Sequence, residues 1–179
     1  MLLHVDGARL SNAAASLGVT FGELTTDAGV DAVSLGATKN GAMGAEAVVF
    51  TNADSVEGFQ FVRKQGMQLA SKMRFMSAQF DALFSGDLWL RAASHANAMA
   101  KKLGEGVESV DGAELVHPVQ ANGVFARLPH DVSRRLMERH RFYFWDEAAG
   151  DVRWMCSFDT TEDDVDAFLA ALREEMGRA

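Results

Sequence analysis

Three short apolar runs near the start of the chain predict buried β-strands. They cover residues 2–5, 30–35 (VDAVSL) and 45–50 (AEAVVF). Apolar runs of this length are typical of strands that are covered on both faces, as in parallel α/β sheets. Between the first two strands, the pattern predicts an alanine-rich helix over residues 8–17 and a short helix near residues 21–27.

The lengths of the connections predict the directions of these strands. Residues 6–29 are long enough for a helical crossover, so the first two strands are expected to be parallel neighbours in a right-handed unit. The loop 36–44 is shorter than the roughly twelve residues that a parallel crossover needs, so the third strand should run antiparallel. Asp6 and Lys39 would then both follow carboxyl ends of parallel strands, at the sheet edge where open α/β sheets bind ligands.

Helical periodicity begins after residue 50. Residues 54–84 predict a helix with breaks near Gly66 and Ser71. In the helix that follows, apolar side chains recur at steps of three and four and make one buried face: Trp89, Ala93, Ala96, Ala100, Leu103 and Val107. We expect a parallel α/β domain over residues 1–85 and a smaller α+β domain over residues 86–179.

The smaller domain is expected to contain four strands and two more helices. The strands and the first of these helices are predicted at residues 114–116, 123–128, 142–145 and 151–158, and at 132–140. The last helix is expected to begin with an approximate capping box, formed either by Thr160 and Asp163 or by Thr161 and Asp164.

Composition narrows the classes of function. The chain has 179 residues, of which 48% are hydrophobic and 23% charged, as in ordinary globular proteins. Its net charge of −8 argues against nucleic acid or an anionic membrane as the main partner, and no window approaches the roughly 18 apolar residues of a membrane span. A single cysteine, Cys156, fits a reducing cytoplasm. The five histidines include no i, i+4 pair, so no metal site is expected.

Lys39 lies in a glycine-flanked loop, LGATKNG, directly after the second predicted strand. A desolvated lysine on such a support is a nucleophilic amine suited to Schiff-base chemistry. An exposed loop lysine without a special role is the alternative. The phosphate-binding loop of nucleoside triphosphatases is excluded, because Lys39 lies between Gly36 and Gly41 instead of following the second glycine.

Asp6 ends the first predicted strand, in HVDGAR. A carboxylate in this position is costly unless a cation or a hydrogen-bond donor meets it. Pairing with Arg9, or capping of a helix that begins at Ala8, would satisfy it. The functional alternative is a carboxylate that keeps a heteroaromatic nitrogen protonated, as enzymes that use pyridoxal phosphate require. The neighbouring position of Lys39 favours this alternative.

Three further basic residues are candidates for anion binding. By period-two alternation, Arg153 lies opposite the most apolar face of the strand 151–158. It is either a solvated edge residue or a fork that binds a carboxylate through two parallel hydrogen bonds. Lys72 and Arg74 either bind an anion such as phosphate or lie on a solvated helix face.

In combination, these motifs resemble the low-specificity L-threonine aldolases, within the beta-eliminating lyase group of fold-type-I pyridoxal phosphate enzymes. The resemblance is carried by HVDGARLSNA, DAVSLGATKNG and AEAVVF, and by RKQGMQLASKMRFMSAQ, ANGVFARLP and VRWMCSFDTTEDDVDAF. It runs through residues 2–175. It implies the C-terminal part of a large cofactor-binding α/β domain over residues 1–85, followed by a small C-terminal α+β domain over residues 86–179.

The resemblance also implies roles for individual residues. Lys39 would hold pyridoxal 5'-phosphate covalently, and Asp6 would contact its pyridine nitrogen. Arg9 and Arg153 would bind the carboxylate of an amino-acid substrate. The implied reaction cleaves a β-hydroxy amino acid of the L-threonine type to glycine and an aldehyde. Another lyase that eliminates a β-substituent, or a catalytically silent fragment, is the alternative.

Relatives of this kind carry a long segment before the DGAR strand. The resemblance therefore implies that the chain is a C-terminal half, acting in a homo-oligomer or with a missing N-terminal half. In such an assembly, Lys72 or Arg74 would bind the cofactor phosphate across a subunit interface.

Overall fold

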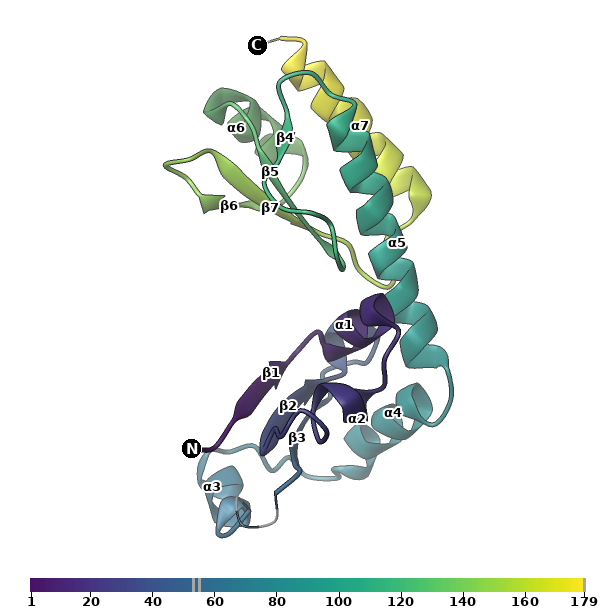
Figure 1. The fold of residues 1–179 in the computed structure, drawn as a ribbon, viewed down its shortest axis with the longest axis vertical. Coiled ribbons are helices and arrows are strands. Elements are labelled where there is room, and N and C mark those ends of the chain that lie inside the picture. Colours follow the sequence, from purple (N-terminus) through teal and green to yellow (C-terminus); the bar gives the residue numbers. More distant parts are fainter. Residues whose placement is uncertain (53, 55, 179) are drawn as a thin grey trace. The chain divides into compact units, whose positions relative to one another are not determined.

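The computed structural model describes residues 1–52, 54 and 56–178 (Figure 1). The chain divides into two compact units, Met1–Ala93 and Ser94–Ala179. The division falls inside one long helix, α5 (Leu88–Glu108). The assignment of residues 1–85 and 86–179 to a cofactor-binding domain and a small domain remains a prediction.

The first unit contains a three-stranded sheet in the order β1-β2-β3. β1 (His4–Gly7) and β2 (Ala32–Gly36) are parallel, whereas β2 and β3 (Glu46–Phe50) are antiparallel. Both directions agree with the prediction from the connection lengths. The first strand begins two residues later than predicted, and the side chains of Leu2 and Leu3 before it are exposed.

Two short helices cover one face of this sheet, α1 (Leu10–Leu17) and α2 (Phe21–Leu24) (Figure 1). Val33 of β2 is buried against this face together with Leu10 and Val30. The apolar side of each strand therefore packs against the crossover that joins β1 to β2, as a βαβ unit requires.

The long helical region predicted after residue 50 forms two helices, α3 (Phe59–Gln65) and α4 (Arg74–Phe84). Between them, Met67 and Lys72 have a left-handed backbone, with φ of 57° at each residue. Residues other than glycine rarely adopt this backbone conformation, and it interrupts a right-handed helix. The predicted region also includes Ser55, which lies outside the described residues.

The second unit contains a four-stranded antiparallel sheet in the order β4-β5-β7-β6. The strands are β4 (Glu114–Leu115), β5 (Gly123–Arg127), β6 (Tyr143–Asp146) and β7 (Asp151–Met155). Two helices follow α5 in this unit, α6 (His130–Arg139) and α7 (Glu162–Met176). None of the described helices has the length and apolar character needed to cross a membrane.

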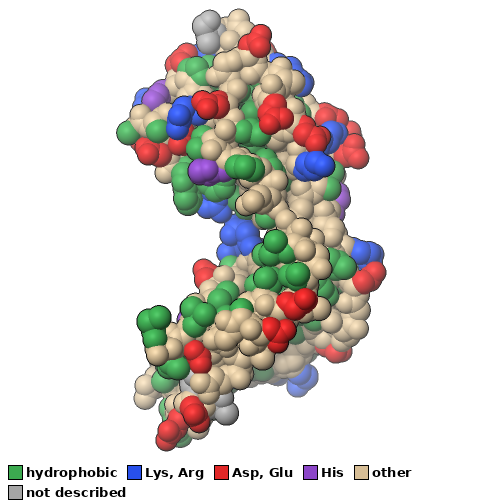
Figure 2. All heavy atoms as spheres, in the orientation of Figure 1, with side chains coloured by type: hydrophobic (Ala, Val, Ile, Leu, Met, Phe, Trp, Pro, Cys, Tyr) green, Lys and Arg blue, Asp and Glu red, His purple; other side chains and the backbone are tan. Residues whose placement is uncertain are grey.

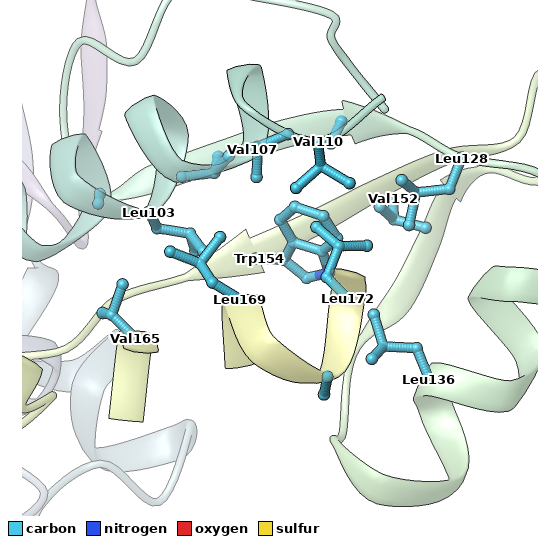
Figure 3. Packing of buried hydrophobic residues seen from close by; sticks show 14 of the residues in the cluster. Leu103, Val107, Val110, Leu128, Leu136, Val152, Trp154, Val165, Leu169 and Leu172 are labelled. Carbon is cyan, nitrogen blue, oxygen red and sulfur yellow. The ribbon is translucent and has the colours of Figure 1, made fainter. Parts of the chain in front are cut away.

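The inner face of the second sheet and the helices α5, α6 and α7 form the main hydrophobic core (Figure 3). Figure 3 shows the indole ring of Trp154, from β7, among side chains that include Leu172 of α7. Helices α5 and α7 approach closely at Gly106, because a Cβ atom there would lie only 2.2 Å from Cδ1 of Leu169. The apolar face predicted for α5 is buried except for the half-buried Trp89, and α7 crosses the helix at a glycine.

The last helix begins with one of the two capping boxes that the sequence allows. The Thr161 N–H donates to Asp164 Oδ2 at 2.8 Å, and the Asp164 N–H donates to the Thr161 hydroxyl at 3.1 Å. The hydroxyl of Thr160 instead accepts a hydrogen bond from the Ser157 N–H at 2.8 Å. That bond belongs to the turn before α7, and β7 consequently ends at Met155, earlier than predicted.

Candidate active site

Asp6 lies near the carboxyl end of β1, and Lys39 follows the carboxyl end of the parallel strand β2. In the strand register, Asp6 lies beside Ser34. The chain leaves β2 at Gly36 and reaches Lys39 within a short 3-10 turn, Thr38–Asn40. The sheet therefore has the topology that the connection lengths predicted for this pair of residues.

Glycines allow the main chain to pack tightly at this edge. A Cβ atom on Gly7 would lie 2.8 Å from the Ser34 carbonyl oxygen. A Cβ atom on Gly36 would lie 2.9 Å from both Ala8 Cα and Glu46 Oε2. The segment after β1 and the carboxylate at the start of β3 thus meet beside Gly36. The edge is a narrow surface of main chain with charged side chains around it.

The loop that carries Lys39 is fixed from the inside. Asn40 is buried and its side-chain amide donates to the Trp89 carbonyl at 2.9 Å. The Ala37 N–H donates to the Ala45 carbonyl at 3.0 Å and closes the base of the loop. Lys39 itself is exposed, and no carboxylate of the described residues forms an ion pair with it. The loop is therefore held in place, but the amine is exposed and not desolvated, as in the alternative that the sequence left open.

The Asp6 carboxylate is exposed and turns the chain out of β1. Its Oδ1 accepts a hydrogen bond from the Ala8 N–H at 3.0 Å. α1 begins at Leu10, later than predicted, and its N-cap position is occupied by Arg9 without a side-chain cap. The alternative that Asp6 caps a helix beginning at Ala8 is therefore wrong. Arg9 is half-buried and has an interaction partner within the chain.

One polar pair beside Asp6 was missed from the sequence. His4 Nε2 and the Ser34 hydroxyl are hydrogen-bonded at 2.9 Å. Period-two alternation places His4 and Asp6 on the same face of β1, and the strand register puts Ser34 there too. The alternation was readable from the sequence, but the diagonal pairing depends on the register, which the sequence does not specify.

Lys72 and Arg74 lie close together in sequence at the start of α4. Both are exposed, and the guanidinium carbon of Arg74 lies 4.9 Å from the ring centroid of Phe75. Neither forms an ion pair with a carboxylate in the described parts of the chain. Their predicted role in phosphate binding remains a prediction.

In the second unit, Arg153 lies on the outer face of β7. Its neighbours Val152 and Trp154 are buried in the core, so Arg153 points to the opposite face, as the alternation predicted. Since β7 lies between β5 and β6, Arg153 is not on an edge strand, and it is half-buried. Within residues 1–52, 54 and 56–178, no carboxylate pairs with it.

The single cysteine is unsuited to nucleophilic catalysis. Cys156 is buried, and burial raises the pKa of its thiol to about 11. At neutral pH the group is therefore a thiol and a poor nucleophile. Among the described residues, no cluster of three or more His, Cys, Asp or Glu side chains is arranged to hold a metal ion.

Two curated proteins show what the chain resembles in sequence. It is 44% identical over 174 residues to a low specificity L-threonine aldolase of a Pseudomonas species, covering 97% of this chain and 50% of that protein. It is also 44% identical to the low specificity L-threonine aldolase of Pseudomonas aeruginosa, covering 98% of this chain and 51% of that protein. The chain thus spans about half the length of these relatives.

Solved structures show the same relation in three dimensions. A threonine aldolase of Leishmania major matches with a TM-score of 0.86 and 27% identity, over 98% of this chain and 52% of that chain. A structure of Oryza sativa TDC with PLP and tryptamine matches with a TM-score of 0.70 and 15% identity, over 99% of this chain and 44% of that chain. The second likeness concerns the fold alone. Both confirm the predicted α/β fold of a partial fold-type-I enzyme.

The family follows from a match to a family model. The model described as beta-eliminating lyase matches residues 1–130, which include both strands of the Asp6–Lys39 edge and more than half of the chain. The resemblance that the sequence motifs indicated is therefore confirmed: the chain belongs to the beta-eliminating lyase family.

Proposed function

We propose that the chain is part of a pyridoxal phosphate-dependent aldolase that cleaves β-hydroxy amino acids of the L-threonine type to glycine and an aldehyde. One observation carries the proposal. Adjacent parallel strands deliver a carboxylate, Asp6, and an amine, Lys39, to the same sheet edge. The aldolases to which the chain is similar give the substrate class.

The residues at this edge suit the cofactor. Gly7 and Gly36 allow the main chain to pack tightly at this edge, which brings the segment that follows Asp6 close to β2. Lys39 is an exposed amine on a fixed loop, and it can be joined to an aldehyde. Asp6 has one carboxylate oxygen oriented by Ala8, and a carboxylate is the group that keeps a pyridine nitrogen protonated.

Each side chain then has a separate task. Lys39 would hold the cofactor through its amine, and Asp6 would keep a proton at the pyridine nitrogen. Arg9 and Arg153 bind and orient the substrate carboxylate, which fixes the direction of the Cα–Cβ bond. When bound, pyridoxal phosphate supplies an electron sink for the carbon that loses the aldehyde. Lys72 or Arg74 binds the phosphate group.

The family itself suggests a second candidate, elimination of a β-substituent from an amino acid. The two reactions differ in their products. An aldolase releases glycine and an aldehyde from L-threonine, whereas an eliminating lyase releases a keto acid and ammonia. Product analysis with L-threonine and L-serine as substrates separates them.

The test of the cofactor site is borohydride reduction of the full chain in the presence of pyridoxal 5'-phosphate, followed by peptide mapping. Reduction makes even a weak attachment permanent, so it suits a chain that spans half of its relatives. We expect the pyridoxyl group on the peptide that contains Lys39, and its loss in Lys39→Ala. Lys101→Ala is the matched control, since Lys101 is an exposed lysine paired with Glu105. A modified lysine at another position would overturn the assignment.

The partners follow from the same proposal. The exposed apolar side chains of the first unit, among them Leu2, Val48 and Phe61, support assembly with further copies or with an N-terminal half. The proposed substrate is a small amino acid. The single buried cysteine supports a reducing, cytoplasmic location.

A further inference from the structure

Arg153 lies among aromatic side chains on the outer face of the second sheet. In the strand register its neighbours are Phe125 on β5 and Tyr143 on β6. Its guanidinium carbon lies 5.3 Å from the ring centroid of Trp145. That distance is within the range of a cation–π interaction, which is strongest with tryptophan.

A β-bulge brings Trp145 to this position. The pairing of β6 with β7 shifts between Phe144 and Asp146, so Trp145 is the extra residue in its strand. Bulges commonly redirect a side chain. The indole ring also makes a T-shaped contact with Phe125, at a centroid distance of 5.2 Å and an interplanar angle of 77°.

A second contact fixes the inner nitrogen of the same guanidinium. Arg153 Nε donates to the sulfur of Met155 at 3.1 Å. Gly123 lies opposite Met155 in the register, and a Cβ atom there would lie 3.3 Å from that sulfur. The glycine therefore makes room for the thioether beside Arg153. One face of the guanidinium and its Nε are thus occupied, and the two terminal amino groups remain for a ligand.

We propose that Trp145 is a positioning residue for Arg153: with Met155, it holds the guanidinium so that the two terminal amino groups form the fork that binds the substrate carboxylate. The carboxylate part rests on the role of Arg153 in the proposed function. The positioning part rests on the ring and sulfur contacts alone. The two parts can therefore fail separately.

The first test observes the Arg153 Nε–H resonance of the full chain by NMR, assigned by its loss in Arg153→Lys. We expect an upfield ring-current shift and slow hydrogen exchange in the unmodified chain. Trp145→Leu keeps an apolar side chain but removes the ring, so the shift should vanish, whereas Trp145→Phe should retain part of it. Because Trp145 is 59% exposed, these replacements leave the core intact.

Two further variants separate the contacts. Tyr143→Ala is the matched control, since Tyr143 is the register neighbour of Arg153 on the same strand as Trp145 and should leave the shift unchanged. Met155→Leu should speed the exchange of the Nε–H while leaving the ring-current shift in place. A resonance that is unshifted in the unmodified chain, or equally shifted in Trp145→Leu, would overturn the positioning role.

The second test titrates the same samples with glycine, the proposed product. The Arg153 resonances should respond, and the dissociation constant should rise about two- to fivefold in Trp145→Leu, because an exposed cation–π contact is lost. Trp145→Phe should restore most of the affinity. If the ring-current results hold but glycine causes no response, the positioning role stands and the carboxylate role of Arg153 in the proposed function is overturned.

Discussion

The two units of the chain bury their apolar residues very differently. The second has one large core that joins α5, α6 and α7 to the sheet, whereas the first has two small clusters around Val33 and Leu83. Most of the large hydrophobic side chains that are exposed lie in the first unit, and Figure 2 shows such side chains at the surface. The second unit buries its apolar side chains as an independent domain does. The first leaves many of them exposed, as a part of a larger sheet would. The difference teaches that Asp6 and Lys39 lie in the unit that buries fewer apolar residues.

The largest test of this difference is truncation of a core leucine. Leu172 is fully buried in the second unit, so Leu172→Ala should lower the free energy of unfolding by about 2–5 kcal/mol. Val33→Ala in the first unit should cost less, because its cluster is small and its surroundings can collapse. Urea unfolding can be followed separately by fluorescence in variants that keep only Trp154, in the second unit, or only Trp89, in the first. Equal losses in both units would contradict the comparison.

A second test uses glycine positions with and without room. Gly106→Ala places a methyl group against Leu169 in the second core, and should cost about 1–3 kcal/mol. Gly86→Ala is the matched control, since a Cβ atom there meets nothing within 4 Å. Gly86→Ala should leave the stability unchanged or raise it by up to about 1 kcal/mol, because alanine lowers the conformational entropy of the unfolded chain. A Gly106→Ala variant as stable as the parent chain would show that the helices can separate without loss.

A third test concerns the edge that carries the proposed site. Gly36→Ala should lower the yield of cofactor attached at Lys39 roughly tenfold, because the new methyl group meets the Ala8 main chain and displaces the loop. Gly22→Ala in the same unit is the control, since its nearest neighbour, the Thr20 hydroxyl, is 3.7 Å away. The readout is borohydride trapping with peptide mapping. Equal yields in the two variants would mean that attachment of the cofactor does not depend on the close approach of the strands.

Much of this architecture was predictable because connection length and periodicity act locally. The parallel and antiparallel directions followed from the loops after Asp6 and after Gly36, and the final capping box from Thr161 and Asp164. The start of α1 was misplaced by two residues, because the Asp6 carboxylate takes the Ala8 N–H and delays the helix. The sequence allowed either a helix that begins at Ala8 or a turn closed by the Asp6 carboxylate, and the three-dimensional geometry decides between them.

The contacts between distant segments were not predictable. The sequence placed Arg153 on the outer face of its strand, but the ring over it depends on a register shift within β6. Arg135 of α6 is a second example, because its Nε donates to the buried carboxylate of Glu175 on α7 at 2.8 Å. Both pairings depend on tertiary packing that brings one strand or helix against another.

The smallest expected effect compares the same capping box in the two units. Glu23 and Asp164 each accept the N–H of the threonine three residues earlier, at 2.7 and 2.8 Å. The bond from the Thr20 N–H, followed by its hydroxyl, lowers the pKa of Glu23 below its ordinary 4.5. The bond from the Thr161 hydroxyl, followed by its N–H, lowers the pKa of Asp164 below its ordinary 3.8. The two boxes therefore have the same pattern of hydrogen bonds, but the leading donor is the N–H in the first and the hydroxyl in the second.

The consequence for stability should differ. A carboxyl group whose folded pKa lies below its unfolded pKa contributes stability that is fully present above the unfolded value and is lost as the pH falls through the folded value. The loss therefore begins near pH 4.5 for the Glu23 box and near pH 3.8 for the Asp164 box, and each continues below that value. The two helices differ in what lies beneath them, because α7 buries five residues and α2 buries none. We therefore expect Thr161→Val to reduce the acid sensitivity of the second unit. The change that Thr20→Val causes in the first unit should be smaller. The acid sensitivity of each unit is measured as the urea midpoint between pH 6 and about 3, read from the fluorescence of Trp154 or Trp89 in the variants that keep only that tryptophan. Equal changes would mean that a cap stabilises its own helix regardless of the core beneath it, and the comparison between the units would then not extend to their surfaces.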